Sequence, residues 1–200
     1  HMPQTKRNGL EEYKNQHIPN SIFFDLDANS KKEISLPHML VDQNDWEQII
    51  SKMGIKNEDE IVIYDNSDVL SSCRCWFNFI YFGHNPKLVH VLNGGLKKWI
   101  KENNEVTKNI INIQPSNYKS FEKKELVKNK KSINQNINEQ KFKVIDARSK
   151  ERFEGKVQEP RKGLRSGSIK NSFCIPFDKC LNENKTFKSK EDLKLIFESC

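Results

Sequence analysis

The chain has 200 residues, of which 35% are hydrophobic and 30% charged, and its formal net charge is +7. This composition can fill a packed core and excludes an intrinsically disordered protein. It also excludes a membrane-spanning helix, because no run approaches the roughly 20 apolar residues that cross a bilayer. The N-terminus shows no secretory pattern, so we expect a cytoplasmic protein.

The positive charge is concentrated in the second part of the chain. Residues 1–103 hold 12 Lys and Arg against 14 Asp and Glu, whereas residues 104–200 hold 22 against 13. A basic surface suits nucleic acid, an acidic membrane or a small anionic substrate. Much of the excess is Lys spread among Asn, without an aromatic-rich module or a helix-turn-helix pattern. We therefore expect a solvated surface, and neither a nucleic-acid nor a membrane partner.

The five cysteines are an odd number in a chain too large to need disulfide staples, so they are predicted to be free thiols. Cys73 and Cys75 are the nearest approach to a metal pattern, but no second pair stands at ligand spacing. We expect neither a metal nor an organic cofactor.

Short apolar strands alternate with helices in the first part of the chain. An amphipathic helix is predicted over residues 45–53, because apolar residues recur at positions 46, 49, 50 and 53. The other elements predicted here are a strand at 17–24 after a turn, a buried strand at 60–64, a helix at 74–80, a strand at 87–92 and a short helix around Trp99.

A second unit repeats this order after a polar segment. Residues 104–140, rich in Asn, Lys, Ser and Gln, are predicted to link a domain at 1–103 to a second domain, of which residues 141–200 form the first part. The elements predicted in the second unit are a strand at 142–147, another within 168–177 and an amphipathic helix at 192–200.

This alternation predicts an α/β fold of two domains, each a mostly parallel sheet with helices on both faces. The second domain is expected to be truncated. Cys200 precedes the counterpart of the strand at 60–64 and of the loop that follows it. In open α/β sheets such loops bind ligands.

Five motifs occur in order along the chain: HIPNSIFFDLD at 17–27, LPHML at 36–40, LNGGL at 92–96, DARSKERFEG at 146–155 and EPR at 159–161. Together they resemble the tandem-domain rhodanese family, which includes thiosulfate and 3-mercaptopyruvate sulfurtransferases. Two departures are modest: Asn93 stands where the family usually has Asp, and the usual GHIPG of the second unit reads GSIKN at 167–171.

The resemblance implies that a loop cysteine of the second domain takes a sulfane sulfur as a persulfide and passes it to a thiol or to cyanide. Backbone N–H groups that point into a loop at a helix N-terminus favour such a thiolate. That loop is expected about twelve residues beyond Cys200, so residues 1–200 alone are expected to be inactive. Asp65 stands at the aligned position of the first domain, which is therefore expected to be non-catalytic.

Asp27 and His38 resemble the acid and base of the serine-histidine-aspartate arrangement proposed in the mercaptopyruvate enzymes, whose serine would belong to the same missing loop. A carboxylate orients an imidazole and stabilises its charged form, so the pair can serve a proton relay. The alternative is a structural hydrogen bond between the strand end and the segment that follows.

Arg152 and Arg161 lie in the segment with which the family grips its anionic substrate. A planar guanidinium donates two parallel hydrogen bonds to one carboxylate. Thiosulfate enzymes commonly lack an arginine at the position of Arg161, so the pair favours 3-mercaptopyruvate as the donor. Arg148 and Arg165 are expected to be surface or structural residues.

The resemblance thus predicts a monomeric 3-mercaptopyruvate sulfurtransferase with a small anionic sulfur donor and a thiol acceptor such as thioredoxin or a small thiol. Three alternatives stay open. They are a thiosulfate sulfurtransferase, a non-catalytic rhodanese-like binding module and a phosphatase of the dual-specificity kind. The two similar units and the arginine pair argue against the phosphatase.

Overall fold

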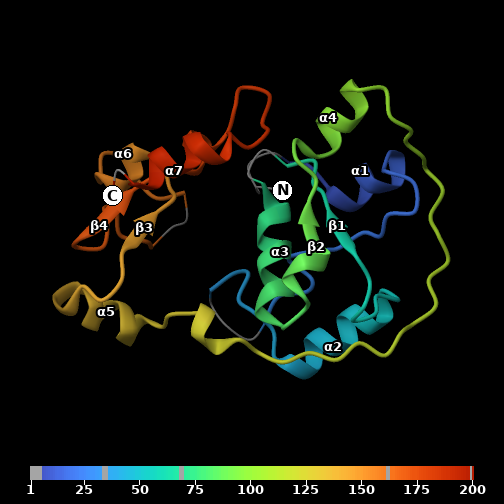
Figure 1. Cartoon of the computed structure of the whole chain (residues 1–200), viewed down its shortest axis with the longest axis horizontal. Coiled ribbons are helices and arrows are strands. Elements are labelled where there is room, and N and C mark those ends of the chain that lie inside the picture. Colours follow the sequence, from blue (N-terminus) through green and yellow to red (C-terminus); the bar gives the residue numbers. More distant parts are fainter. Residues whose placement is uncertain (1–5, 33–35, 68–69, 161–162, 199) are drawn as a thin grey trace. The chain divides into compact units, whose positions relative to one another are not determined.

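The computed structural model describes residues 6–32, 36–67, 70–160, 163–198 and 200. The chain folds as two compact units, residues 1–126 and 127–200 (Figure 1). The boundary between them falls within the segment 104–140, which the sequence assigns to a linker. Each unit contains its own pair of parallel strands.

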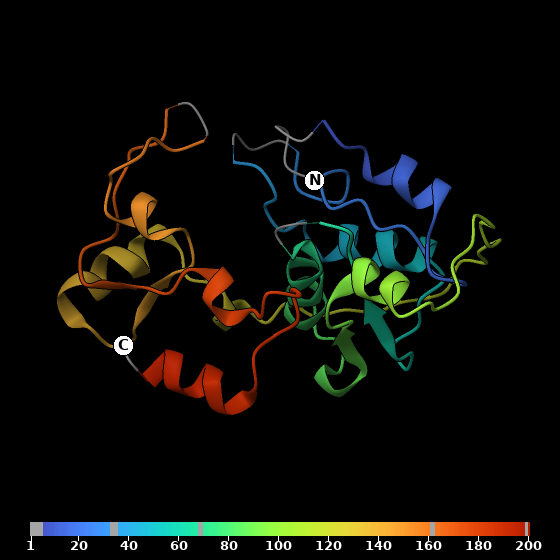
Figure 2. The same cartoon turned by 90° about the horizontal axis from the view of Figure 1, so that it is seen from above.

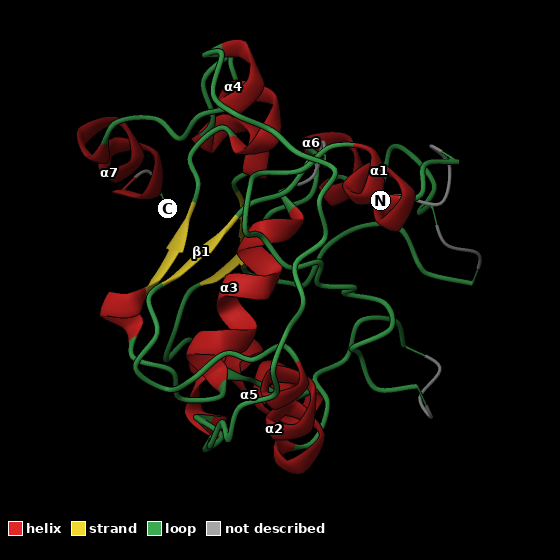
Figure 3. Cartoon of the chain, turned by 90° about the vertical axis from the view of Figure 1, so that its right-hand side faces the viewer, coloured by secondary structure: helices red, strands yellow, loops and turns green. Residues whose placement is uncertain are grey.

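A two-stranded parallel sheet and the helix α3 form the centre of the first unit. The elements described in this unit are α1 (Gly9–Asn15), α2 (Gln43–Lys52), β1 (Ile61–Ile63), α3 (Ser71–Tyr81), β2 (Val89–Val91), α4 (Gly95–Lys101) and 3₁₀ turns at Pro86–Leu88 and Lys124–Leu126. Ile61 of β1 pairs with Val89 of β2. Figure 3 shows α3 beside this sheet, and α3 contacts both strands.

Aromatic side chains fill the core of the first unit. Trp46 and Ile50 of α2 are fully buried, as the helical spacing of apolar residues predicts. Trp46 stacks on Phe82 with ring centroids 4.7 Å apart. Tyr118 is also buried in this core. Part of the segment 104–140 therefore packs on the first unit.

The strand predicted at residues 17–24 does not form. Tyrosine hydroxyls satisfy backbone groups there that a neighbouring strand would otherwise bind. The carbonyl oxygen of Ser21 accepts a hydrogen bond from the hydroxyl of Tyr13 at 2.7 Å, and the N–H of Ile18 donates to the hydroxyl of Tyr64 at 3.2 Å. The segment turns at Pro19 and Asn20, and His17 forms an isolated antiparallel bridge with Thr107. It belongs to no sheet among the described residues.

The second unit also contains two parallel strands, with Val144 of β3 opposite Ser172 of β4. Its described elements are α5 (Lys130–Glu139), β3 (Val144–Asp146), α6 (Lys150–Phe153), β4 (Ser172–Cys174), a 3₁₀ turn at Phe177–Cys180 and α7 (Lys190–Glu198). The parallel pairing predicted for each unit is confirmed.

Two helices of the second unit differ from the sequence prediction. Helix α5 lies in the segment assigned to the linker, and its N-cap residue Asn129 accepts the backbone N–H of Ser132 at 2.9 Å. Helix α7 ends at Glu198, so Cys200, the last residue of the helix predicted at 192–200, lies beyond it and is half-buried. Figure 2 shows α7, in red, apart from α5, in ochre, and Leu195 of α7 is 67% exposed.

Candidate functional site

The loop after β1 places a carboxylate near its start, that of Asp65, against the first turn of α3. Asp65 Oδ2 accepts the backbone N–H of Ser72 at 2.8 Å and the hydroxyls of Ser67 and Ser71 at 3.1 and 3.2 Å. A helix N-terminus favours negative charge, because its first N–H groups are unpaired and its dipole is positive there. The side chain of Asp65 therefore occupies the anion-binding position of this unit.

The LNGGL motif fixes the backbone of the same loop from the other side. Leu96 donates its N–H to the carbonyl oxygen of Asp65 at 3.0 Å. A Cβ on Gly95 would lie 2.6 Å from that oxygen, and Gly95 has a φ of +56°. Only glycine permits both the close approach and this backbone conformation without strain. The motif thus anchors the Asp65 loop.

The structure brings together Asp27 and His38, the two candidate relay residues. Asp27 Oδ1 and His38 Nε2 lie 2.6 Å apart, and the two side chains are 72% and 42% exposed. Exposed ion pairs contribute about 0–1 kcal/mol to stability. A purely structural role would therefore gain little from this contact.

The backbone around His38 is held by a residue that sequence reasoning missed. His38 has a φ of +58°, and its carbonyl oxygen accepts a 2.6 Å hydrogen bond from Nη2 of Arg74 on α3. Burial lowers the pKa of the Arg74 guanidinium, and its Nε has no hydrogen-bond partner among the described residues. Arg74 thus connects the helix that follows the Asp65 loop to the candidate relay.

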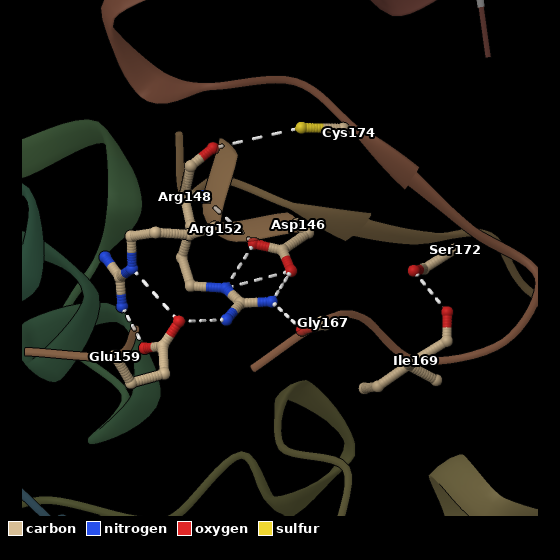
Figure 4. A network of polar contacts seen from close by, with 8 residues as sticks. All are labelled: Asp146, Arg148, Arg152, Glu159, Gly167, Ile169, Ser172 and Cys174. Carbon is tan, nitrogen blue, oxygen red and sulfur yellow. Dashed lines mark hydrogen bonds and ion pairs between the residues drawn. The ribbon is translucent and has the colours of Figure 1, made fainter. Parts of the chain in front are cut away.

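Four charged side chains of the second unit form one network (Figure 4). Arg152 Nε and Nη2 donate to the two carboxylate oxygens of Glu159 at 3.2 and 2.5 Å. Arg148 Nη1 donates to the same carboxylate at 2.8 Å, and its Nε and Nη2 donate to Asp146 at 3.0 and 2.5 Å. Arg148, expected to be a surface or structural residue, is the centre of this network. Arg161 lies outside the described residues.

These contacts keep both carboxyl groups ionised near neutral pH. The hydrogen bond from Arg152 holds the pKa of Glu159 below its usual value, against the opposing effect of burial. The hydrogen bond from Arg148 likewise lowers the pKa of Asp146. Two guanidinium groups therefore share two carboxylates, and the network is neutral in formal charge.

The cysteines with shifted pKa values are not prepared as nucleophiles. Burial raises the pKa of Cys75 to about 12. Burial and the nearby charge of Asp65 raise the pKa of Cys73, and burial raises those of Cys174 and Cys180. A reactive cysteine needs a lowered pKa, because the thiolate is the attacking species.

The described residues contain no group of three or more His, Cys, Asp and Glu side chains arranged to hold a metal ion. Within the same part of the chain, no helix is long and apolar enough to cross a membrane.

Comparison with known proteins gives consistent matches. The model of the rhodanese-like domain matches residues 9–102. Thiosulfate/3-mercaptopyruvate sulfurtransferase 1, mitochondrial, of Arabidopsis thaliana is 35% identical over 99% of this chain and 57% of its own length. The 3-mercaptopyruvate sulfurtransferase of Mus musculus is 31% identical over 99% of this chain and 67% of its own. The chain thus spans about three fifths to two thirds of these relatives.

Solved structures agree with the sequence matches. SseA from Escherichia coli, described as a 3-mercaptopyruvate sulfurtransferase with the rhodanese fold, superimposes with a TM-score of 0.87 at 27% identity, covering 98% of this chain and 73% of its own. Tum1 of Saccharomyces cerevisiae gives 0.88 at 28% identity, covering 100% and 69%. The chain belongs to the rhodanese-like family of thiosulfate and 3-mercaptopyruvate sulfurtransferases.

Proposed function

We propose that the natural protein containing these 200 residues transfers sulfur from 3-mercaptopyruvate, through a cysteine persulfide, to a thiol acceptor or to cyanide. The family supports sulfur transfer in general. The observation that favours mercaptopyruvate as the donor is the 2.6 Å contact between Asp27 and His38.

The two donors differ in their need for a proton. When a cysteine thiolate attacks the sulfur of 3-mercaptopyruvate, the C–S bond breaks and its electron pair stays on the carbon as pyruvate enolate. The enolate must then take up one proton to become pyruvate. Thiosulfate gives up its outer sulfur as the S–S bond breaks, and the departing sulfite needs no proton. A histidine oriented by a carboxylate therefore suits mercaptopyruvate.

In this proposal, His38 delivers the proton through a loop serine outside residues 1–200, while Asp27 orients its imidazole. Arg152 and Arg161 bind the carboxylate and ketone oxygens of the donor. The attacking cysteine is also assigned outside residues 1–200, as the family resemblance implies. Burial raises the pKa of Cys73, Cys75, Cys174 and Cys180, so none of these four has the lowered pKa of a nucleophile. The first unit is non-catalytic in this proposal, since Asp65 cannot form a persulfide.

Steady-state assays of the full-length protein with each donor test the proposal, together with the variant His38→Gln. The kcat for 3-mercaptopyruvate is expected to fall about a hundredfold in this variant, the low end of general acid–base effects. The kcat for thiosulfate should stay within about threefold, and thermal stability should barely change. His90→Gln is the matched control, because His90 forms a similarly exposed pair with Glu60 at 3.0 Å.

Other results would select the alternatives. If thiosulfate is the better donor and His38→Gln affects neither reaction, the protein is a thiosulfate sulfurtransferase. If neither donor is used by a folded protein, the non-catalytic binding module takes the place of the enzyme.

Partners and location remain predictions. Thioredoxin or a small thiol would accept the sulfur, and the protein would act as a monomer in the cytoplasm. One relative carries the word mitochondrial in its name. Fractionation of the native cells would decide the location.

A further inference from the structure

The side chain of Glu159 lies between two guanidinium groups and has little exposed surface. Its Oε1 accepts from Nη1 of Arg148 at 2.8 Å, and its two oxygens accept from Arg152 at 3.2 and 2.5 Å (Figure 4). The side chain is only 4% exposed. Glutamate side chains are seldom this little exposed unless they are paired, and charge-assisted hydrogen bonds to arginine fix the geometry of both groups.

The contact with Glu159 determines how Arg152 can meet a ligand. Two hydrogen bonds to the Glu159 carboxylate, from Nε and Nη2, hold the planar guanidinium side-on to that carboxylate. Rotation of the plane would break one of them. Nη1 has no recorded contact in the described part of the chain, and the side chain of Arg152 is 31% exposed. The Nη1 end is therefore the part of Arg152 that remains to bind an anion.

Arg148 keeps the carboxylate itself in place. It joins Glu159 to Asp146 at the end of β3 and to the carbonyl oxygen of Gly167 at 2.7 Å. The orientation of Arg152 is thus fixed, through Glu159 and Arg148, by the sheet of its own unit.

On the basis of the proposed function, we propose that Glu159 is the positioning residue of the donor site. It holds Arg152 side-on, so that Nη1 is presented to an anionic oxygen of the sulfur donor, that of the carboxylate in 3-mercaptopyruvate or that of thiosulfate. The network has no excess formal charge. Donor binding therefore depends on where Nη1 is placed, and Glu159 determines that placement without touching the donor.

The test uses two variants of the full-length protein, Glu159→Asp and Glu159→Gln. Aspartate keeps the charge, but its carboxylate is one methylene shorter and cannot span both arginines. Glutamine keeps the length but loses the charge. The matched control is Glu154→Gln in the same segment, because Glu154 pairs only with lysines, Lys156 at 2.6 Å and Lys150 at 3.8 Å, among its recorded ion pairs.

Both Glu159 variants are expected to raise KM for both donors by at least about tenfold, with kcat within about threefold. The Kd for pyruvate, measured by titration calorimetry, should rise by a similar factor. The control variant should change none of these values. Melting temperatures measured in parallel show whether each variant is folded.

Several results would overturn the assignment. An unchanged KM with a lower melting temperature, or failure of both variants to fold, would make Glu159 a structural residue. A lower KM would mean that Glu159 competes with the donor. If the unmodified protein transfers sulfur from neither donor, the proposed function fails. Pyruvate binding then tests the role of Glu159 separately. Weaker binding by the Glu159 variants then still supports the assignment, whereas equal binding, or none by the unmodified protein, refutes it.

Discussion

The carboxylate of Asp65 accepts the backbone N–H of Ser72 at 2.8 Å, in the first turn of α3. Asp65→Ala removes this acceptor and two serine contacts, so the variant is expected to lose about 1–2 kcal/mol of unfolding free energy, the range of a lost helix cap. Urea denaturation measures the change. Asp42→Ala is the control, because Asp42 stands at the N-cap of α2 without a side-chain capping bond. Equal losses in both variants would contradict the assigned role.

Arg74 and His38 provide a second test. A left-handed φ costs a non-glycine residue about 1–2 kcal/mol, and the bond from Arg74 holds His38 in it. Arg74→Met is expected to lower kcat for 3-mercaptopyruvate about tenfold and to leave thiosulfate transfer within about threefold. Arg7→Met serves as the control, because Arg7 also donates to a backbone carbonyl, that of Asn66 at 3.0 Å. Equal effects on the two donors would assign Arg74 a structural role only.

Cys75 gives a prediction of thiol reactivity. With a pKa of about 12, its thiolate fraction at pH 8 is about a thousandfold or more below that of an ordinary cysteine. Iodoacetamide should therefore leave Cys75 unmodified in the folded protein and label it in urea, as mass spectrometry of digests would show. Rapid labelling of the folded protein would contradict the burial of Cys75.

The same pKa shift has a consequence for stability. Because the pKa of Cys75 is raised on folding, the native state holds its proton more tightly than the unfolded state does. The contribution is complete below about pH 8.5, the pKa of an ordinary thiol, and is lost as pH rises toward 12. Cys75→Ala should weaken this decline of unfolding free energy between pH 8.5 and 10.

The spacing of apolar residues in the sequence was sufficient to predict most elements of the first unit. Helix α2 and strand β1 lie within two residues of their predicted positions, because Trp46, Ile50 and Ile63 follow the period of their own element and are buried. Residues 17–24 are as apolar as a strand. Two of their backbone groups bind the hydroxyls of Tyr13 and Tyr64, and the backbone of His17 pairs with Thr107, contacts that no local pattern reveals.

Helix α5 and the charge network show what the sequence pattern leaves undetermined. The only large apolar residues of α5 are Ile133 and Ile137, so its Lys and Asn content resembles that of a linker. The pairing of Asp27 with His38 was predicted from the family resemblance, because the two residues have the same separation in the sequence as the acid and base of the family. Glu159 was missed because its role depends on two arginines that the fold brings to one carboxylate. The one signal in the sequence was that the acidic residue Glu159 stands between Arg152 and Arg161.

The choice of donor is tested most directly at Arg161. This residue lies outside the described part of the chain, so the expectation rests on its position in the EPR motif. Two guanidinium groups suit a donor with adjacent carboxylate and ketone oxygens, and a charge-assisted hydrogen bond contributes about 1.5–3 kcal/mol. Arg161→Ala should therefore lower kcat/KM for 3-mercaptopyruvate about tenfold to a hundredfold. Thiosulfate, a compact dianion without a ketone, should be affected less.

Arg165→Ala is the matched control for this experiment, because Arg165 is an exposed arginine four residues further along the same segment. It should leave both reactions unchanged, since its charge is solvated and surface charges are screened by salt. The informative quantity is the ratio of kcat/KM for the two donors in each variant. A ratio that Arg161→Ala leaves unchanged, because both reactions fall equally, would remove the argument for a ketone-bearing donor. Thiosulfate would then become the favoured substrate.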